Sequence, residues 1–269
     1  MIKLILSAPV PEISAAFVYY FADDENVEVI SKPFETIPNF DCMVSAANSF
    51  GLMDGGVDAA ITAYFGHQLQ KRVQQRIIKD WLGEQPVGTA FVIESGDSNH
   101  PWLVHAPTMR VPMIIDGTDA VYNATWAALL AVHRHNLTAS EDSQIKSVVF
   151  PAMGAGCGQV APNSVASQMK LAWTNFNNSP SVINWDYASA RQSSVTHTSA
   201  YCHCAGVCPN AITKYIGLGE YRTFCSKTGK DCISRKHQLD DVMFGTHTHS
   251  LHSQTTISHV HSISNKATK

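Results

Sequence analysis

Several classes of protein are excluded by what this sequence has little of. Charged residues make up only 15% of its 269 residues, and 19 Lys and Arg stand against 22 Asp and Glu, for a net charge of −3. Nucleic-acid-binding proteins usually carry a basic face that releases counterions. The scattered cations here form no such face, so we expect no general nucleic-acid binding. No apolar run approaches the roughly 18 to 20 residues that span a bilayer, so we expect no membrane partner.

We also expect no secretion signal in the N-terminal stretch. Pro9, Pro11 and Glu12 interrupt the N-terminal apolar stretch where a signal peptide needs a continuous one. The 7 Cys are unevenly placed, with most of them crowded near the C-terminal end, unlike the pattern of a small secreted disulfide scaffold. Both observations favour a reducing environment, and we expect a soluble, cytoplasmic protein.

What the sequence does contain is an alternation of short apolar runs with amphipathic segments, typical of strands covered by helices. Gly66 is expected to divide the second helical stretch into two helices. The predicted strands are 2–6, 27–30, 41–46, 89–94, 102–106 and 147–150, and the predicted helical stretches are 13–21, 56–79, 116–136 and 161–176. These elements indicate an α/β fold over residues 1–178.

Beyond residue 178 the composition changes to Ser, Thr, His and Cys, and periodicity is weak. We therefore predict that residues 179–269 are a poorly ordered C-terminal extension, because such a segment buries too little apolar area to offset its ordering entropy. The extension holds enough soft ligands for a zinc ion, but they include no Cys-x-x-Cys pair, and we favour no metal. These potential ligands are Cys202, Cys204, Cys208, Cys225, Cys232 and His237.

Two glycine-rich loops follow buried strands and lead into helices, which is where open α/β sheets bind ligands. The first contains Asn48 and Gly55-Gly56, before a helix that starts near Val57. The second is Gly154-Ala155-Gly156-Cys157-Gly158. Free amides at a helix start and in a glycine-rich turn favour an anion. A single glycine-rich turn after a strand is common in proteins and does not by itself indicate a ligand. Two such turns in one domain indicate a phosphate-bearing ligand.

These residues resemble a known family. Val44-Ser45-Ala46-Ala47-Asn48 followed by Gly55-Gly56-Val57-Asp58 is similar to the macrodomain pattern, in order and in spacing. The runs Val104-His105-Ala106-Pro107 and Phe150-Pro151-Ala152 agree with it. The variant from Asn48 to Gly56 most resembles a macrodomain-like subgroup of bacterial, phage and fungal proteins. The resemblance implies a three-layer α/β/α fold with a mixed central sheet that binds ADP-ribose or a derivative.

The resemblance also implies roles for individual residues. Asn48 would bind the distal ribose, and Gly55, Gly56 and Val57 would close around that ribose and its phosphate. Gly154, Ala155, Gly156, Cys157 and Gly158 would hold the diphosphate. Asp58, with Asn48 the expected catalytic pair, would orient or activate a water without any metal or cofactor. An acidic residue is equally typical of a first helical turn, so a purely structural Asp58 stays open.

The chain departs from the family pattern in two places. Many members carry an upstream Asp for adenine, where this chain has Glu35 within Pro33-Phe34-Glu35-Thr36-Ile37. The second loop lacks the family's aromatic, which favours a more open distal site. We expect Cys157 to be a small residue that fills a tight turn and not a nucleophile. We expect His105 to be a core or rim histidine and not a catalyst.

Three functions are therefore compatible with the residues. The first is hydrolysis of an ADP-ribose adduct, either an ester-linked ADP-ribosyl group or ADP-ribose 1''-phosphate. The second is a non-catalytic reader of ADP-ribosylated partners or nucleotide signals. The third is a structural or assembly protein that keeps the fold without the ligand.

Overall fold

The computed structural model describes residues 2–199, 211–217 and 220–225. Its core is a six-stranded sheet in the order β2-β1-β6-β3-β5-β4. All neighbouring strands are parallel except β4, which runs antiparallel to β5. The strands are β1 (Lys3–Ser7), β2 (Val27–Ile30), β3 (Cys42–Ser45), β4 (Phe91–Glu94), β5 (Trp102–His105) and β6 (Ser147–Pro151). The prediction of a mixed central sheet is confirmed.

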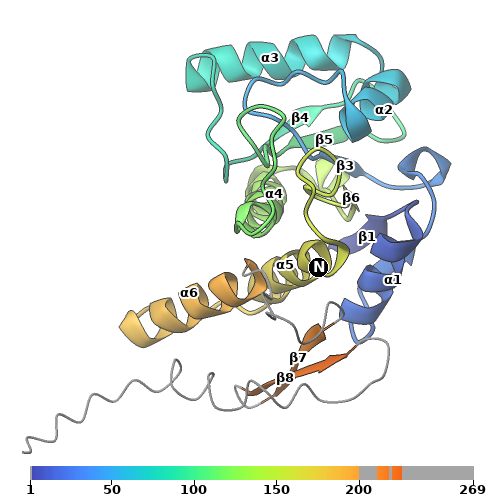
Figure 1. The fold of residues 1–269 in the computed structure, drawn as a ribbon. Helices are drawn as coiled ribbons and strands as arrows, with labels where there is room; N and C mark the ends of the chain where they lie inside the picture. Colours follow the sequence, from blue (N-terminus) through green and yellow to red (C-terminus); the bar gives the residue numbers. More distant parts are fainter. Residues whose placement is uncertain (1, 200–210, 218–219, 226–269) are drawn as a thin grey trace, which may run out of the picture. The chain divides into compact units, whose positions relative to one another are not determined.

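Helices cover both faces of the sheet (Figure 1). One face packs against α1 (Pro11–Tyr20), α4 (Ala120–Thr138) and α5 (Pro162–Asn177), and the other against α2 (Gly56–Phe65) and α3 (Gln68–Trp81). Each face of the sheet has its own hydrophobic core, because successive side chains of a strand point to opposite faces. In β6, Val148 and Phe150 belong to the core of the first face, and Val149 belongs to the core of the second. The predicted α/β/α layering is confirmed.

Local sequence explains where the helices on the second face begin and end. Gly66 adopts a φ of 90°, which a side chain rarely tolerates, and it ends α2 as expected. In α3 the buried residues are Leu69, Val73 and Ile77, which are four apart and therefore lie on one side of the helix. That stripe packs on the second face, in one core cluster with Met43 of β3 and Ile61 of α2.

A helix that the composition did not indicate follows residue 178. This helix, α6 (Trp185–Ser199), packs on α5 and buries Val195 at 6% exposure. Its Arg191 donates a hydrogen bond to the Tyr122 hydroxyl at 3.0 Å and stacks over Trp126. The first compact unit accordingly spans Met1–His203, and α6 belongs to it.

The second unit spans Cys204–Lys269 and is described only at two strands. These are β7 (Ala211–Gly217) and β8 (Glu220–Cys225), which pair as an antiparallel hairpin. The potential zinc ligands of the extension lie outside the residues whose side chains are described. Among the side chains that are described, no group of three His, Cys, Asp or Glu is arranged to hold a metal. No helix in the described ranges is long and apolar enough to cross a membrane.

Candidate functional site

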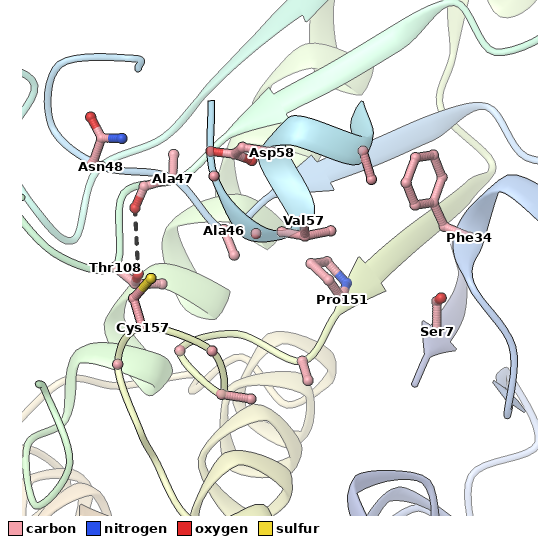
Figure 2. A pocket seen from close by; sticks show the side chains of 18 of the residues that line it. Ser7, Phe34, Ala46, Ala47, Asn48, Val57, Asp58, Thr108, Pro151 and Cys157 are labelled. Atoms are coloured by element: carbon pink, nitrogen blue, oxygen red, sulfur yellow. Dashed lines mark hydrogen bonds between the residues drawn. The ribbon is translucent and has the colours of Figure 1, made fainter. Parts of the chain in front are cut away.

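A cavity of about 400 Å³ lies at the carboxyl edge of the sheet. Because β1, β3, β5 and β6 are mutually parallel, their carboxyl ends meet at this edge. After β1 the chain crosses to α1 on one face of the sheet, and after β3 it crosses to α2 on the other face. The cavity therefore lies at the point where the connections switch from one face of the sheet to the other. It is lined by every residue predicted for the site: Asn48, Gly55, Gly56, Val57, Asp58, Gly154, Ala155, Gly156, Cys157 and Gly158. The structure therefore brings both predicted loops together (Figure 2).

The first anion-binding element is the N-terminus of α2. Gly55 is the N-cap and has no side chain to cap the helix, and the first helical hydrogen bond runs from Ala59 N to Gly55 O. The amides of Gly56, Val57 and Asp58 have no acceptor among the described residues. A side chain added at Gly55 or Gly56 would meet open space. Uncapped amides and the helix dipole here favour a negatively charged group in the cavity.

The second element is the turn after β6. Gly154 has a φ of 75°, and its carbonyl accepts a hydrogen bond from Val160 N at 3.2 Å. Gly158 packs so tightly that a Cβ there would overlap the Gly154 carbonyl oxygen. The amides of Gly156 and Cys157 donate to no acceptor within the described chain. The turn thus presents free backbone donors opposite those of α2.

Asp58 lies in the first turn of α2 and is buried, with 5% of its surface exposed. One carboxylate oxygen accepts a hydrogen bond from the Ser45 hydroxyl at 2.7 Å. Burial raises the pKa of Asp58 to about 6, and the hydrogen bond from Ser45 partly opposes that rise. No hydrogen bond joins its second oxygen, Oδ2, to another described residue. At neutral pH the group is mostly an anion with one oxygen available to a ligand or water.

Asn48 organises its own loop as well as lining the cavity. Its amide nitrogen donates to Leu52 O at 2.7 Å, and its oxygen accepts from the amides of Phe50 and Leu52 at 3.1 and 3.3 Å. One N–H of the side chain is left for a ligand. No local pattern in the sequence indicates this second role, because it depends on how the loop from 48 to 52 closes on itself.

The sequence matches a family model and several known proteins. The family model for the macro domain matches residues 44–169. A macro domain-containing protein of Listeria monocytogenes is 32% identical over 135 residues, which cover 49% of this chain and 69% of that protein. This chain belongs to the macro domain family. A further relative of this macrodomain, an uncharacterized protein of Aquifex aeolicus, is 32% identical over 128 residues, covering 48% of this chain and 68% of the relative.

Solved macrodomains are also similar to it. The Oceanobacillus iheyensis macrodomain with ADP has a TM-score of 0.44 and is 20% identical, covering 61% of this chain and 87% of that one. The Mycobacterium tuberculosis DarG macrodomain has a TM-score of 0.42 and is 17% identical, covering 51% and 83%. A Trypanosoma brucei macrodomain solved in complex with ADP-ribose has a TM-score of 0.39 and is 14% identical, covering 64% and 58%.

The macrodomain cavity has a second, more apolar end that was not predicted. Ala8, Pro9 and Val10 after β1, together with Ile13, line it beside the buried Phe34 and the exposed Glu35. Figure 2 shows Phe34 and Ser7 on one side of the cavity and Asn48 and Cys157 on the other, with Val57 and Pro151 between them. Ser7 could have indicated this end from the sequence, because it is the last residue of a strand that runs parallel to the other central strands.

Two further residues of the macrodomain were weighed from the sequence. Cys157 is a free, exposed thiol at the cavity wall. His105 is fully buried at the end of β5, and its Nδ1 donates to the side-chain oxygen of Gln85 at 2.7 Å. Burial lowers the pKa of His105 to about 3, so the ring is neutral. His105 is therefore a core histidine, and it does not line the cavity.

Proposed function

We propose that this macrodomain binds ADP-ribose and hydrolyses a bond to the anomeric carbon of its distal ribose. The observation that carries the proposal is the meeting of two sets of free backbone amides and one buried carboxylate at a single cavity. Amides at a helix start and in a glycine-rich turn bind phosphate oxygens without any cationic side chain. Family membership supports the same ligand.

The shape of the cavity supports one orientation of the ligand. The adenine would lie at the apolar end near Phe34, where the Glu35 carboxylate could accept a hydrogen bond from its amino group. The diphosphate would lie between the amides of α2 and those of the turn from Gly154 to Gly158. The distal ribose would then reach Asn48 and Asp58. In this orientation the apolar adenine ring contacts apolar side chains, and the negatively charged phosphates contact backbone amides.

The proposed reaction uses a water and the free oxygen of Asp58. The water oxygen forms a bond to the anomeric carbon as the bond from that carbon to the leaving-group oxygen breaks. Asp58 accepts the proton of the water, and the leaving group departs with the electron pair. A positioned general base of this kind contributes roughly 10² to 10⁴ in rate. Ionised Asp58 suits this role because only one of its oxygens is occupied by Ser45.

The test is the substitution Asp58→Asn, which keeps the size of the side chain and an acceptor for Ser45. We expect calorimetry to give ADP-ribose binding within a few-fold of wild type, while release of ADP-ribose from an ester-linked adduct falls by about 100-fold or more. Asp23→Asn, which removes an exposed carboxylate outside the cavity, is the control and should retain turnover. Retained turnover in Asp58→Asn contradicts the catalytic role.

One observation favours a second candidate, a non-catalytic reader of ADP-ribosylated partners. Asp58 is 5% exposed and bonded to Ser45, which is also what a purely structural residue that ties α2 to β3 would do. Wild-type protein that binds ADP-ribose but turns over neither an ester-linked adduct nor ADP-ribose 1''-phosphate would establish the reader. Folded protein that gives no heat with millimolar ADP-ribose would exclude both and leave the structural or assembly role.

A further inference from the structure

A fully buried glutamine lies in an otherwise exposed loop. Gln85 lies between α3 and β4 and is 0% exposed, whereas its neighbours Glu84 and Pro86 are exposed. It does not line the cavity. Burying an amide side chain costs free energy unless both of its groups are hydrogen-bonded. The hydrogen bonds of Gln85 therefore indicate what this residue does.

The side chain of Gln85 belongs to a directional chain of hydrogen bonds. The Thr89 hydroxyl donates to Pro86 O at 2.7 Å, so it accepts from Gln85 Nε2 at 3.1 Å. The oxygen of Gln85 consequently faces His105 Nδ1, at 2.7 Å. Because an amide oxygen only accepts, these bonds assign the proton of neutral His105 to Nδ1. The buried Nε2, which has no hydrogen-bond partner among the described residues, is then the unprotonated nitrogen.

The main chain of Gln85 supports the loop that carries Asn48. Gln85 N donates to Ser49 O at 2.9 Å. Gln85 is thus bonded to this loop through its backbone and to His105 through its side chain. His105 ends β5, and the chain that follows it pairs with the same loop. The hydrogen bond between Gln85 and His105 therefore joins two segments that both hold this loop.

The segment after β5 is hydrogen-bonded to residues on both sides of Asn48. Thr108 N donates to Ala47 O at 3.0 Å, and Ser49 N donates to Met109 O at 3.1 Å. Figure 2 shows Thr108 beside Ala47, which directly precedes Asn48. Asn48 lies between these contacts, so the direction of its side chain depends on the segment staying in place.

We propose that Gln85 and His105 are positioning residues that orient Asn48 toward the distal ribose, an inference that rests on the proposed function. Neither residue lines the cavity, so both act through the loop. Burial lowers the pKa of His105 to about 3, so the ring stays neutral and keeps its Nδ1 proton at neutral pH. The pair acts on the ribose alone, because the diphosphate is held by backbone amides elsewhere in the cavity.

The first experiment compares two ligands that differ in the distal ribose. Calorimetry with the full chain measures the affinities for ADP-ribose and for ADP, and the ratio of the two isolates the contribution of that ribose. Gln85→Leu removes the acceptor of His105 with little change in volume. We expect it to lower the ADP-ribose affinity about tenfold and the ADP affinity by less than about twofold, as for the loss of one hydrogen bond.

Gln168→Leu is the matched control. Gln168 is also 0% exposed and lies outside the cavity lining. Its side chain accepts from Tyr122 N and donates to Thr118 O, both at 2.9 Å, which joins α5 to the start of α4. We expect this variant to lose stability as well, while the ratio of the two affinities stays within about twofold of wild type. An equal fall of the ratio in both variants would report general destabilisation and would overturn the proposal.

Substitutions at His105 separate hydrogen bonding from packing. His105→Asn keeps an N–H donor at the position of Nδ1, whereas His105→Leu occupies similar space without a donor. We expect the ratio of affinities to stay within about threefold of wild type in His105→Asn and to fall about tenfold in His105→Leu. These variants also carry the test if Gln85→Leu does not fold. Equal ratios in the two His105 variants contradict the proposal.

A spectroscopic signature checks the pair without any ligand. Long-range ¹H–¹⁵N correlation spectra of the full chain distinguish the two neutral tautomers of a histidine. We expect His105, assigned through its backbone, to show a protonated Nδ1 and an unprotonated Nε2, with no titration between about pH 5 and pH 8. The opposite tautomer would overturn the proposal, because Nδ1 would then have no proton to donate to Gln85.

The outcomes separate this inference from the proposed function. Folded wild-type protein that does not bind ADP-ribose contradicts the proposed function, and the role of the pair falls with it. If wild type binds ADP-ribose and Gln85→Leu leaves the ratio of affinities unchanged, only the inference is wrong. Equal losses for ADP-ribose and ADP in Gln85→Leu also overturn it, because the pair would then support the whole cavity and not the ribose end.

Discussion

At the scale of single residues, the environment of Asp58 determines the pKa of its carboxyl group. A carboxyl in the first turn of a helix is ordinarily stabilised as an anion by the helix dipole. Here burial under β3 acts in the opposite direction and raises the pKa of Asp58 to about 6, even though Ser45 donates a hydrogen bond to it. The position in sequence left both a catalytic and a purely structural Asp58 open, and only the packing raises the pKa of this carboxyl to about 6.

This pKa gives a prediction for the pH dependence of turnover. Asp58 acts as a base only when ionised, so kcat/KM for the ester-linked adduct should rise with pH and level off above an apparent pKa of about 6. The measurement is an initial-rate profile between about pH 4.5 and pH 8. A rising limb centred near 4, where an exposed carboxyl titrates, would show that another acid or a different step controls the rate.

The same residue gives a prediction for stability. Because the pKa of Asp58 is raised in the folded state, folding is favoured by this group at low pH, and the contribution is lost as pH rises through about 6. At neutral pH the buried charge costs on the order of 2 to 3 kcal/mol.

We therefore expect Asp58→Asn to be more stable than wild type at about pH 7.5, with the difference closing toward about pH 4. Urea unfolding at the two pH values measures it. Asp54→Asn, at an exposed position, should show no such trend. A difference that is the same at both pH values would mean that the substitution acts through packing and not through the charge.

At the scale of elements, the turn from Gly154 to Gly158 owes its shape to glycines packed against their surroundings. A Cβ at Gly158 would overlap the Gly154 carbonyl oxygen and lie 2.8 Å from Ile115 Cγ1. A Cβ at Gly156 would meet nothing within 4 Å. The two glycines look alike in the sequence, yet only one is required by packing.

We expect Gly158→Ala to lower the free energy of unfolding by about 1 to 3 kcal/mol, because the turn must open to admit the methyl group. ADP-ribose affinity should fall with it, since the free amides of the turn move. Gly156→Ala is the matched control for stability and should change it by less than about 0.5 kcal/mol. Thermal unfolding and calorimetry on both variants measure these effects, and equal stability of the two would contradict the role given to Gly158.

At the scale of the whole molecule, α6 extends the α/β unit past the boundary that composition predicted at 178. Its helical periodicity is weak because Ser and Thr occupy many positions of Trp185–Ser199, and its first residue, Trp185, is 87% exposed. The helix is held by tertiary contacts, chiefly Val195 in the core and Arg191 beside Trp126. Propensity alone does not reveal such a helix, because packing supplies most helical stability in proteins.

Truncation tests this assignment. A chain of residues 1–203, the first compact unit, should fold and bind ADP-ribose with the affinity of the full chain. A chain of residues 1–178 lacks α6 and should be less stable by about 1 to 3 kcal/mol, because Val195 no longer covers the core. Chemical unfolding of both chains provides the measurement. If the two are equally stable, α6 contributes nothing to the unit, and the boundary belongs at 178.

The sequence by itself determined the elements and the two loops. Apolar alternation predicted the six strands, Gly66 predicted the break between α2 and α3, and the spacing from Asn48 to Asp58 indicated the family. These features are local, since they depend on side-chain period and on glycine conformation. The sequence also placed both loops at the carboxyl ends of strands, where open α/β sheets bind ligands, and the structure shows that the two loops meet at one cavity.

Only the tertiary structure decided the properties that depend on distant neighbours. Ser45 on β3 and the burial around it set the pKa of Asp58, and the end of β1 with Phe34 forms the apolar half of the cavity. The segment from Met109 to Ile115 connects the two loops only because Ser49 N donates to Met109 O and Ile115 N donates to Gly158 O. Desolvation and hydrogen bonding are summed over everything that packs around a group, and no window of sequence contains that sum.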